Sequence, residues 1–209
     1  MEIIDLFAGC GGFSCGFQKA EFNIAVAVEF EKMIANSYSA NHKNTKMIAD
    51  DIKNVDNDNV FSEGDADIII GGPPCQGFSM AGARIRGNFI EDPRNYLFKH
   101  YFNIVKIVKP KLFILENVKG ILTIKNGEIF NEIKNSFESI GYKMQYKVIK
   151  VRDLGIPQAR ERVVVFGSIY DFNLNGEMNK TIKQISKTDN NFFSPTTVSD
   201  AISNLPKPT

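Results

Sequence analysis

The sequence lacks the features of several large protein classes. No apolar run approaches the roughly 20 residues that a membrane-spanning helix needs, so we expect no membrane association. There is no internal repeat, and the chain opens directly on an expected strand, so we expect no signal peptide. The net charge of +1 gives no overall basic signature, so a nucleic-acid partner would have to be bound by a local patch.

Cysteine and histidine are both scarce. Cys10, Cys15 and Cys75 form an odd set, which favours a reducing, cytoplasmic environment over a disulfide framework. Cys10 and Cys15 lack a second pair of ligands, so we expect no metal site and interpret both as packing residues. His42 and His100 fall within or near expected helices, away from strand ends, which argues against a hydrolase with a Cys–His pair.

Short apolar runs alternate with helix-like stretches over most of the chain. This pattern predicts an α/β fold with a mostly parallel sheet and helices on both faces. The last two strands are joined too tightly for a helical crossover and should be antiparallel. The expected strands are residues 3–7, 24–28, 47–49, 67–70, 112–115, 143–151 and 162–167, and the expected helices are 14–20, 31–41, 96–108 and 126–140.

The regular pattern fades at about residue 170. We therefore place a core domain at residues 1–170 and interpret 171–209 as a connection toward a further domain. Residues 171–195 are rich in Asn, Lys and Ser and predict a mobile segment, and 198–202 predict the start of a helix.

Four chemically active side chains follow predicted parallel strands. Asp5, Glu29, Cys75 and Glu116 all fall at carboxyl ends, which share one edge of a parallel sheet. This predicts a Cys/Glu pair beside a small-molecule pocket. Cys75 stands on a glycine-flanked turn with two prolines, as expected of a reactive thiol; the alternative is a buried, inert one. For Glu116, the alternative is a carboxylate that caps the following turn.

A glycine-rich turn, residues 7–13, follows the first strand and opens a helix. Glycines let a ligand approach the backbone, and a helix N-terminus favours an anionic group. The turn does not meet G-x-G-x-x-G, because Ser14 holds the last position, and it is not a P-loop. Glu29, at the end of the next strand, could accept ribose hydroxyls. These features predict an adenosine-bearing ligand with a carboxylate; the alternative is a tight turn without a ligand.

The chain carries four short motifs in order, at residues 5–14 (DLFAGCGGFS), 72–79 (GPPCQGFS), 116–118 (ENV) and 158–162 (QARER). These motifs resemble those of the DNA (cytosine-5)-methyltransferases. The resemblance implies a Rossmann-like fold that uses S-adenosylmethionine and a prokaryotic-type enzyme of a restriction–modification system. It also implies double-stranded DNA as the partner and a cytoplasmic, nucleoid-associated location.

The resemblance also implies the residues that bind the cofactor. Phe7 would stack on the adenine, and Glu29, beside Phe30, would hold the ribose hydroxyls. Asp51 and Ile52 would lie near the adenine edge. The full implied set is Asp5, Phe7, Gly9, Gly11, Gly12, Glu29, Phe30, Asp51, Ile52, Pro74 and Leu97.

The implied mechanism is covalent catalysis on a cytosine turned out of the helix. Cys75 would add to C6, Glu116 would support N3 and the N4 amine, and C5 would take the methyl group. Of Arg160 and Arg162, one would contact the base or orient Glu116, and the other would contact flanking phosphates. The alternative for the two arginines is an exposed turn that forms ion pairs with its neighbours. Residues 76–94 resemble the mobile catalytic loop of the family.

The chain departs from the family pattern after the fourth motif. The target-recognition domain and the final motifs that complete the cofactor pocket are missing from the sequence. Three interpretations stay open: a truncated product, one subunit of a split enzyme whose partner carries the rest, or a fragment. An RNA cytosine-5 methyltransferase and a non-catalytic remnant that binds cofactor or DNA are the alternative functions.

Overall fold

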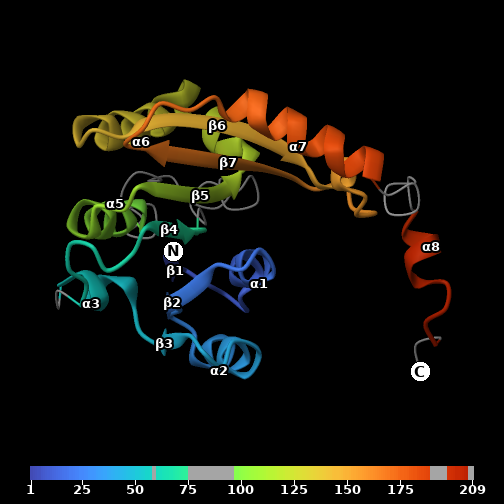
Figure 1. The fold of residues 1–209 in the computed structure, drawn as a ribbon, viewed down its shortest axis with the longest axis horizontal. Coiled ribbons are helices and arrows are strands. Elements are labelled where there is room, and N and C mark those ends of the chain that lie inside the picture. Colours follow the sequence, from blue (N-terminus) through green and yellow to red (C-terminus); the bar gives the residue numbers. More distant parts are fainter. Residues whose placement is uncertain (58–59, 75–96, 189–196, 207–209) are drawn as a thin grey trace.

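The computed structural model describes residues 1–57, 60–74, 97–188 and 197–206, with only the backbone of residues 57 and 182–188. Its centre is a seven-stranded sheet in the order β3-β2-β1-β4-β5-β7-β6 (Figure 1). Strands β1 to β5 are parallel, and β7 lies antiparallel between β5 and β6. This confirms the predicted α/β class and its antiparallel end. The strands are β1 Glu2–Leu6, β2 Asn23–Val28, β3 Lys46–Ile48, β4 Ile68–Gly71, β5 Leu112–Val118, β6 Lys143–Lys150 and β7 Glu161–Ser168.

Helices connect the strands and cover the sheet. Their bounds are α1 Gly12–Lys19, α2 Lys32–Asn41, α3 Ile52–Asn57, α5 Leu97–Val108, α6 Glu128–Ser139, α7 Leu174–Thr188 and α8 Val198–Ile202, with 3₁₀ turns η2 Lys119–Leu122, η3 Ile124–Gly127 and η4 Val151–Leu154. No helix in the described part of the chain is both long and apolar enough to cross a membrane.

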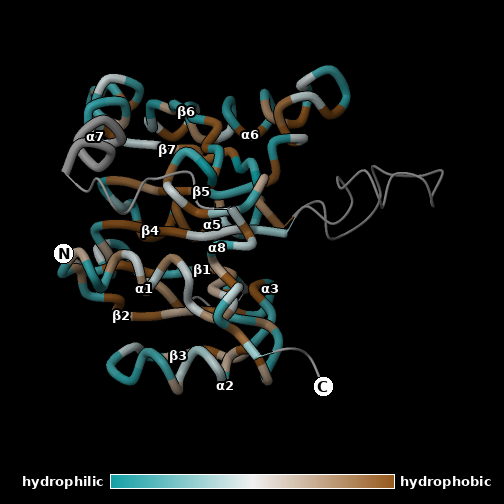
Figure 2. The backbone as a smooth tube through the Cα atoms, turned by 90° about the vertical axis from the view of Figure 1, so that its right-hand side faces the viewer, coloured by the Kyte–Doolittle hydropathy of each residue, from teal (hydrophilic) through white to brown (hydrophobic). Residues whose placement is uncertain are grey.

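The two faces of the sheet carry separate hydrophobic clusters. Side chains alternate along a strand, so Ile4 and Leu6 of β1 face α3, α5 and α6, whereas Ile3 faces the aromatic side chains of α1. The apolar strands run through the middle of the molecule in Figure 2. Tyr101 of α5 is fully buried, and its hydroxyl donates to the carbonyl oxygens of Ile69 and Ile114, each at 3.1 Å. This bond pair fixes α5 across the junction of β4 and β5.

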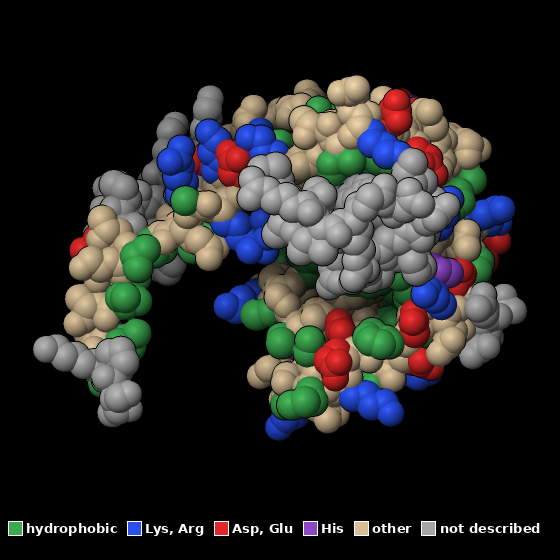
Figure 3. All heavy atoms as spheres, turned by 180° about the vertical axis from the view of Figure 1, so that it is seen from behind, with side chains coloured by type: hydrophobic (Ala, Val, Ile, Leu, Met, Phe, Trp, Pro, Cys, Tyr) green, Lys and Arg blue, Asp and Glu red, His purple; other side chains and the backbone are tan. Residues whose placement is uncertain are grey.

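The segment after residue 170 differs from the sequence-based expectation. Most of the predicted mobile stretch is helix α7, whose first residue, Leu174, is buried. The Leu174 N–H donates to Gln145 Oε1 of β6 at 2.9 Å, so a partner 29 residues away starts the helix. Helix α8 follows, and it exposes Val198 and Ile202. Hydrophobic side chains gather on the arm at the left of Figure 3.

Cys10 and Cys15 are exposed, so the expectation that they are packing residues is wrong. Neighbouring residues occupy the interior instead. Ser14 is fully buried, and Phe13 and Phe17 pack against the sheet. The short helix α1 turns its aromatic side chains inward and leaves both thiols outside.

Candidate active site

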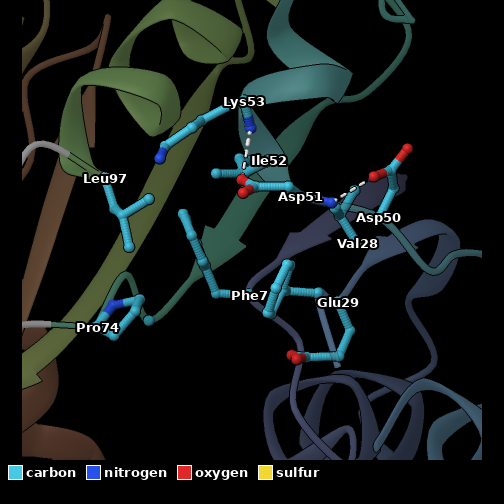
Figure 4. Close-up of a pocket in the computed structure, with 11 residues that line it drawn as sticks. Phe7, Val28, Glu29, Asp50, Asp51, Ile52, Lys53, Pro74 and Leu97 are labelled. Atoms are coloured by element: carbon cyan, nitrogen blue, oxygen red, sulfur yellow. Dashed lines mark hydrogen bonds between the residues drawn. The ribbon is translucent and has the colours of Figure 1, made fainter. Parts of the chain in front are cut away.

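A cavity of ≈ 540 Å³ opens at the carboxyl ends of β1, β2 and β4 (Figure 4). Its walls are two aromatic side chains, four apolar ones, a glycine, three carboxylates and one lysine. The lining residues are Phe7, Val28, Glu29, Phe30, Asp50, Asp51, Ile52, Lys53, Gly72, Pro74 and Leu97. The structure thus brings together seven of the expected binding residues. Sequence reasoning did not include Val28, Asp50, Lys53 and Gly72 among the binding residues. The first three directly neighbour an expected residue, and Gly72 lies two positions before Pro74.

Phe7 enters the cavity because the chain turns sharply after β1. Its φ of 58° lies in the left-handed region, where a residue with a bulky side chain is rare and needs support from its surroundings. That support comes from the next residue, since the Ala8 N–H donates to Val28 O at 3.0 Å. The strained turn therefore presents the ring at the end of the sheet.

The Glu29 carboxylate is held by two backbone groups. The Gly9 N–H donates to Oε2 at 2.8 Å, and the Glu31 N–H donates to Oε1 at 3.0 Å. A carboxylate has about four lone-pair positions, so both oxygens can still accept a hydroxyl group from a ligand. Glu29 is therefore oriented in advance and keeps free acceptor capacity.

Asp50 and Asp51 cap the start of α3 at the cavity. The Lys53 N–H donates to Asp51 Oδ1 at 3.0 Å, as in a helix N-cap. Asp50 Oδ1 accepts from the Asn54 amide at 2.9 Å and from the Asp51 N–H at 2.7 Å, and these bonds hold the pKa of Asp50 below its usual range. With Glu29, the lining has three carboxylates against one lysine. This charge balance favours a ligand with cationic groups and disfavours a pyrophosphate.

Asp5 and the turn glycines Gly9, Gly11 and Gly12 do not line the cavity. Asp5 is 1% exposed, lies under the turn and accepts from Ser14 Oγ at 2.6 Å. Burial raises the pKa of Asp5 to about 7.

The same buried layer continues into α2. Ser14 Oγ also bonds to the Tyr38 hydroxyl at 2.7 Å. A Cβ at Gly11 would lie 2.1 Å from His42 Nε2, so only glycine fits above this layer. Asp5 and Gly11 thus shape the turn from below, and their assignment to the cofactor stays a prediction.

Glu116 and Arg162 meet at the neighbouring part of the same edge. Antiparallel pairing sets Arg162 of β7 opposite Val118, two residues along β5 from Glu116. Arg162 Nε lies 2.7 Å from Glu116 Oε1, and Arg162 Nη1 donates to Glu161 O at 2.8 Å. Arg160 is exposed and shows no contact with Glu116. Of the two expected arginines, the one that meets Glu116 is therefore Arg162.

Gly72 separates the cavity from this ion pair. It lines the cavity, and a Cβ built on it would lie 3.3 Å from Glu116 Oε2. The Glu116 carboxylate therefore lies directly behind the part of the cavity wall that Gly72 forms. A ligand in the cavity and a group bound to Glu116 would be neighbours.

Asn117 ties the two strand ends together. It is 4% exposed, and its Nδ2 donates to Pro73 O at 3.1 Å while its Oδ1 accepts from the Val118 N–H at 2.8 Å. The bond fixes the chain two residues before Cys75. Cys75 itself, with the rest of residues 75–96, lies outside the described residues.

Comparison with known proteins agrees with this arrangement. The model of the C-5 cytosine-specific DNA methylase family matches residues 1–208. The Type II methyltransferase M1.HphI of Haemophilus parahaemolyticus is 41% identical over 210 residues, which are 99% of this chain and 53% of that protein. M.AquIA of Picosynechococcus is 34% identical over 227 residues, which cover 100% of this chain and 90% of that protein.

A solved structure shares the fold. It is provisionally described as a DNA modification methyltransferase of an E. coli prophage, with a TM-score of 0.74 and 30% identity over 99% of this chain and 56% of that one. The chain spans about half the length of relatives such as M1.HphI and M.DdeI. From residue 1 to 208, its ordered motifs and its sheet are those of one family, and the chain belongs to the C-5 cytosine-specific DNA methylases.

Proposed function

We propose that this chain is the catalytic part of a DNA (cytosine-5)-methyltransferase that uses S-adenosylmethionine. The observation that carries the proposal is the acidic, aromatic cavity whose wall at Gly72 adjoins the Glu116–Arg162 pair. The curated relatives M1.HphI and M.DdeI are named as Type II methyltransferases, which supports a role in a restriction–modification system.

The cavity lining suits this cofactor. S-adenosylmethionine supplies an electrophilic methyl group on a positively charged sulfur. Glu29 would accept hydrogen bonds from the ribose hydroxyls with its free lone pairs, and Phe7 would stack on the adenine. Ile52 and Leu97 cover the base, and the negative lining favours the cationic end. Asp5, Gly9, Gly11 and Gly12 act on the cofactor through the shape of the turn.

On the proposed reaction path, Cys75 forms a temporary bond to cytosine. The thiolate adds to C6, and the electron density gained by the ring is stabilised by a proton or hydrogen bond from Glu116 at N3. C5 would then take the methyl group that the cofactor supplies, as the methyl–sulfur bond breaks and a neutral thioether is left. Loss of the C5 proton and departure of the thiolate restore the aromatic ring. The target base has to leave the DNA stack to reach these groups.

Arg162 and Arg160 have separate roles in the proposed reaction. The 2.7 Å contact holds the Glu116 carboxylate in one orientation, which helps it to face the N3–N4 edge of the base. Arg160 is exposed on the same edge, and we assign it to a phosphate beside the target base.

We also propose that target recognition and the rest of the cofactor pocket come from residues beyond these 209. Chains such as M1.HphI, of which this sequence matches 53%, support a single longer polypeptide. M.AquIA, which is matched over 90% of its length, is a relative of similar length, and a second subunit that carries the remainder stays the alternative. The bound DNA is double-stranded, and the protein acts in the cytoplasm at the nucleoid.

The test has two stages. With the missing residues supplied in cis or in trans, isothermal titration with S-adenosylhomocysteine should show saturable binding, and no binding would overturn the cofactor assignment. In the presence of S-adenosylmethionine, duplex DNA that contains 5-fluorocytosine should then give a denaturation-resistant complex with the wild-type protein but not with Cys75→Ala. A complex formed with tRNA but not with DNA would favour the RNA enzyme instead.

A further inference from the structure

Two walls of the cavity belong to different helices and are held together just below the ligand space. Ile52 stands at the start of α3 and Leu97 at the start of α5. Residues three or four apart lie one turn further along the same face of a helix. One helical turn after Ile52 lies Asp56 on α3, and one turn after Leu97 lies His100 on α5.

Asp56 joins the two helices through one carboxylate oxygen. Its Oδ2 lies 2.9 Å from His100 Nδ1 and also accepts from Asn103 Nδ2 at 2.9 Å. The side chain of Asp56 is 8% exposed and that of His100 is 23% exposed. A carboxylate this shielded from water depends on its donors, because an unpaired charge there would be costly. We refer to Asp56, His100 and Asn103 as the α3–α5 clamp.

The clamp matters because α3 is a short helix at the wall of the cavity. The helix has six residues, too few to be stable alone, and its buried side chains are Ile52 and Val55. Apolar contacts permit sliding, whereas two hydrogen bonds to one atom define a position. The clamp therefore sets how far Ile52 stands from Leu97.

We propose that Asp56 is a positioning residue for the cofactor: through His100 and Asn103 it fixes the spacing of the two apolar walls that enclose the adenine. This inference rests on the proposed function, because it takes the ligand to be adenosine-bearing. Nothing in the motifs points to these residues, which are separated by 44 and 47 positions in the sequence.

The chain offers a matched control at the other end of the same helix. Lys109, which directly follows α5, pairs with Glu63 at 2.6 Å, and both side chains are more than half exposed. This pair also ties α5 to the segment between α3 and β4, but away from the cavity lining. Removing the Lys109–Glu63 pair therefore shows how much the cofactor affinity changes when a contact of α5 is lost away from the cavity.

The experiment compares S-adenosylhomocysteine affinity and thermal stability in four variants of the full chain. Asp56→Ala should weaken binding about tenfold, since it frees one wall. Asp56→Asn should recover most of the loss, because its amide oxygen can still accept both bonds. Glu63→Ala should stay within about twofold of wild type, which is ordinary scatter for an uncoupled site.

The fourth variant, Asn103→Ala, keeps the His100 pair and serves if Asp56→Ala does not fold. We expect it to weaken binding by a smaller factor while folding normally. Unchanged affinity in folded Asp56→Ala or, if that variant does not fold, in Asn103→Ala would overturn the positioning role, whatever the change in Tm. Absence of binding by the wild-type chain would instead overturn the cofactor assignment, and the clamp's proposed role with it.

Discussion

The cavity and the Glu116–Arg162 pair occupy the same edge of the sheet but are built differently. Glu29 and Asp51 are held by backbone N–H groups two to twenty residues away, so nearby turns fix them. Glu116 is held by a side chain 46 positions further on, so its orientation depends on the pairing of β5 with β7. Single substitutions should therefore damage the pair more than the cavity.

The largest effect should come from Cys75→Ala. The proposed chemistry cannot start without the thiolate, so methyl transfer should fall below detection. The affinity for S-adenosylhomocysteine should stay near the wild-type value, because the side chains that we propose to hold the cofactor, such as Phe7 and Glu29, are unchanged. Parallel transfer assays and titrations measure both quantities. A large loss of binding would mean that the thiol has a structural role.

Arg162→Ala removes the only side chain seen to orient Glu116 among the described residues. We expect kcat to fall by about 10²- to 10³-fold, as for a lost electrostatic or acid–base contribution, with little change in cofactor KM. Arg160→Ala is the matched control and should mainly weaken DNA binding, with a shallower salt dependence. Equal losses of kcat in both variants would argue against the assigned division of work.

Asp5→Asn tests the support beneath the cavity. The Asp5 pKa is about 7 in the folded protein against 3.8 for an unperturbed Asp, so the folded state binds the proton more tightly. The stability from this proton is present below pH 4 and is lost as the pH rises through 7. Near pH 8 the Asn variant should be more stable by on the order of 3 kcal/mol.

Urea unfolding of wild type and Asp5→Asn at pH 5 and pH 8 measures the difference. Wild-type stability should decline between the two values, and that of the variant should decline less. A wild-type stability that rises with pH would show that Asp5 is ionised in the folded protein across this range. Ser14→Ala, which removes the 2.6 Å donor, should steepen the decline.

Glu29→Gln should have the smallest effect. The amide oxygen can still accept the Gly9 N–H bond, so the turn keeps its shape, but the charge that attracts the ligand is lost. We expect affinity for S-adenosylhomocysteine to drop about tenfold, without a change in kcat at saturation. Titration measures this, and a fall in kcat at saturating cofactor would place Glu29 in the chemistry.

The sequence predicted those features of the fold that depend on hydrophobic periodicity and on the order of strands and helices along the chain. Strand ends alone grouped Glu29 with Glu116, and the tight connection between the last two strands predicted their antiparallel pairing. Alternation along β1 could also have shown that Asp5 shares a side with Ile3, toward α1 and away from the cavity.

What sequence reasoning missed depends on contacts between distant positions. Helix α7 was not predicted because the residue that holds its first N–H group, Gln145, lies in strand β6. The bond between Asp56 and His100 spans 44 positions and leaves no periodic trace. Exposed Cys10 and Cys15 contradict the general tendency of cysteine to be buried, and only the orientation of α1 shows why.

The position of β7 between β5 and β6 has a consequence for synthesis of the chain on the ribosome. Strand β6 emerges first but has no neighbour until β7 arrives, because β5 pairs with β7. Until about residue 168 has left the exit tunnel, a nascent chain therefore carries one strand without a partner and an open edge on β5. Such edges attract other chains and the chaperones that shield them. The part of the sheet that carries Glu116 and Arg162 is thus the last to close.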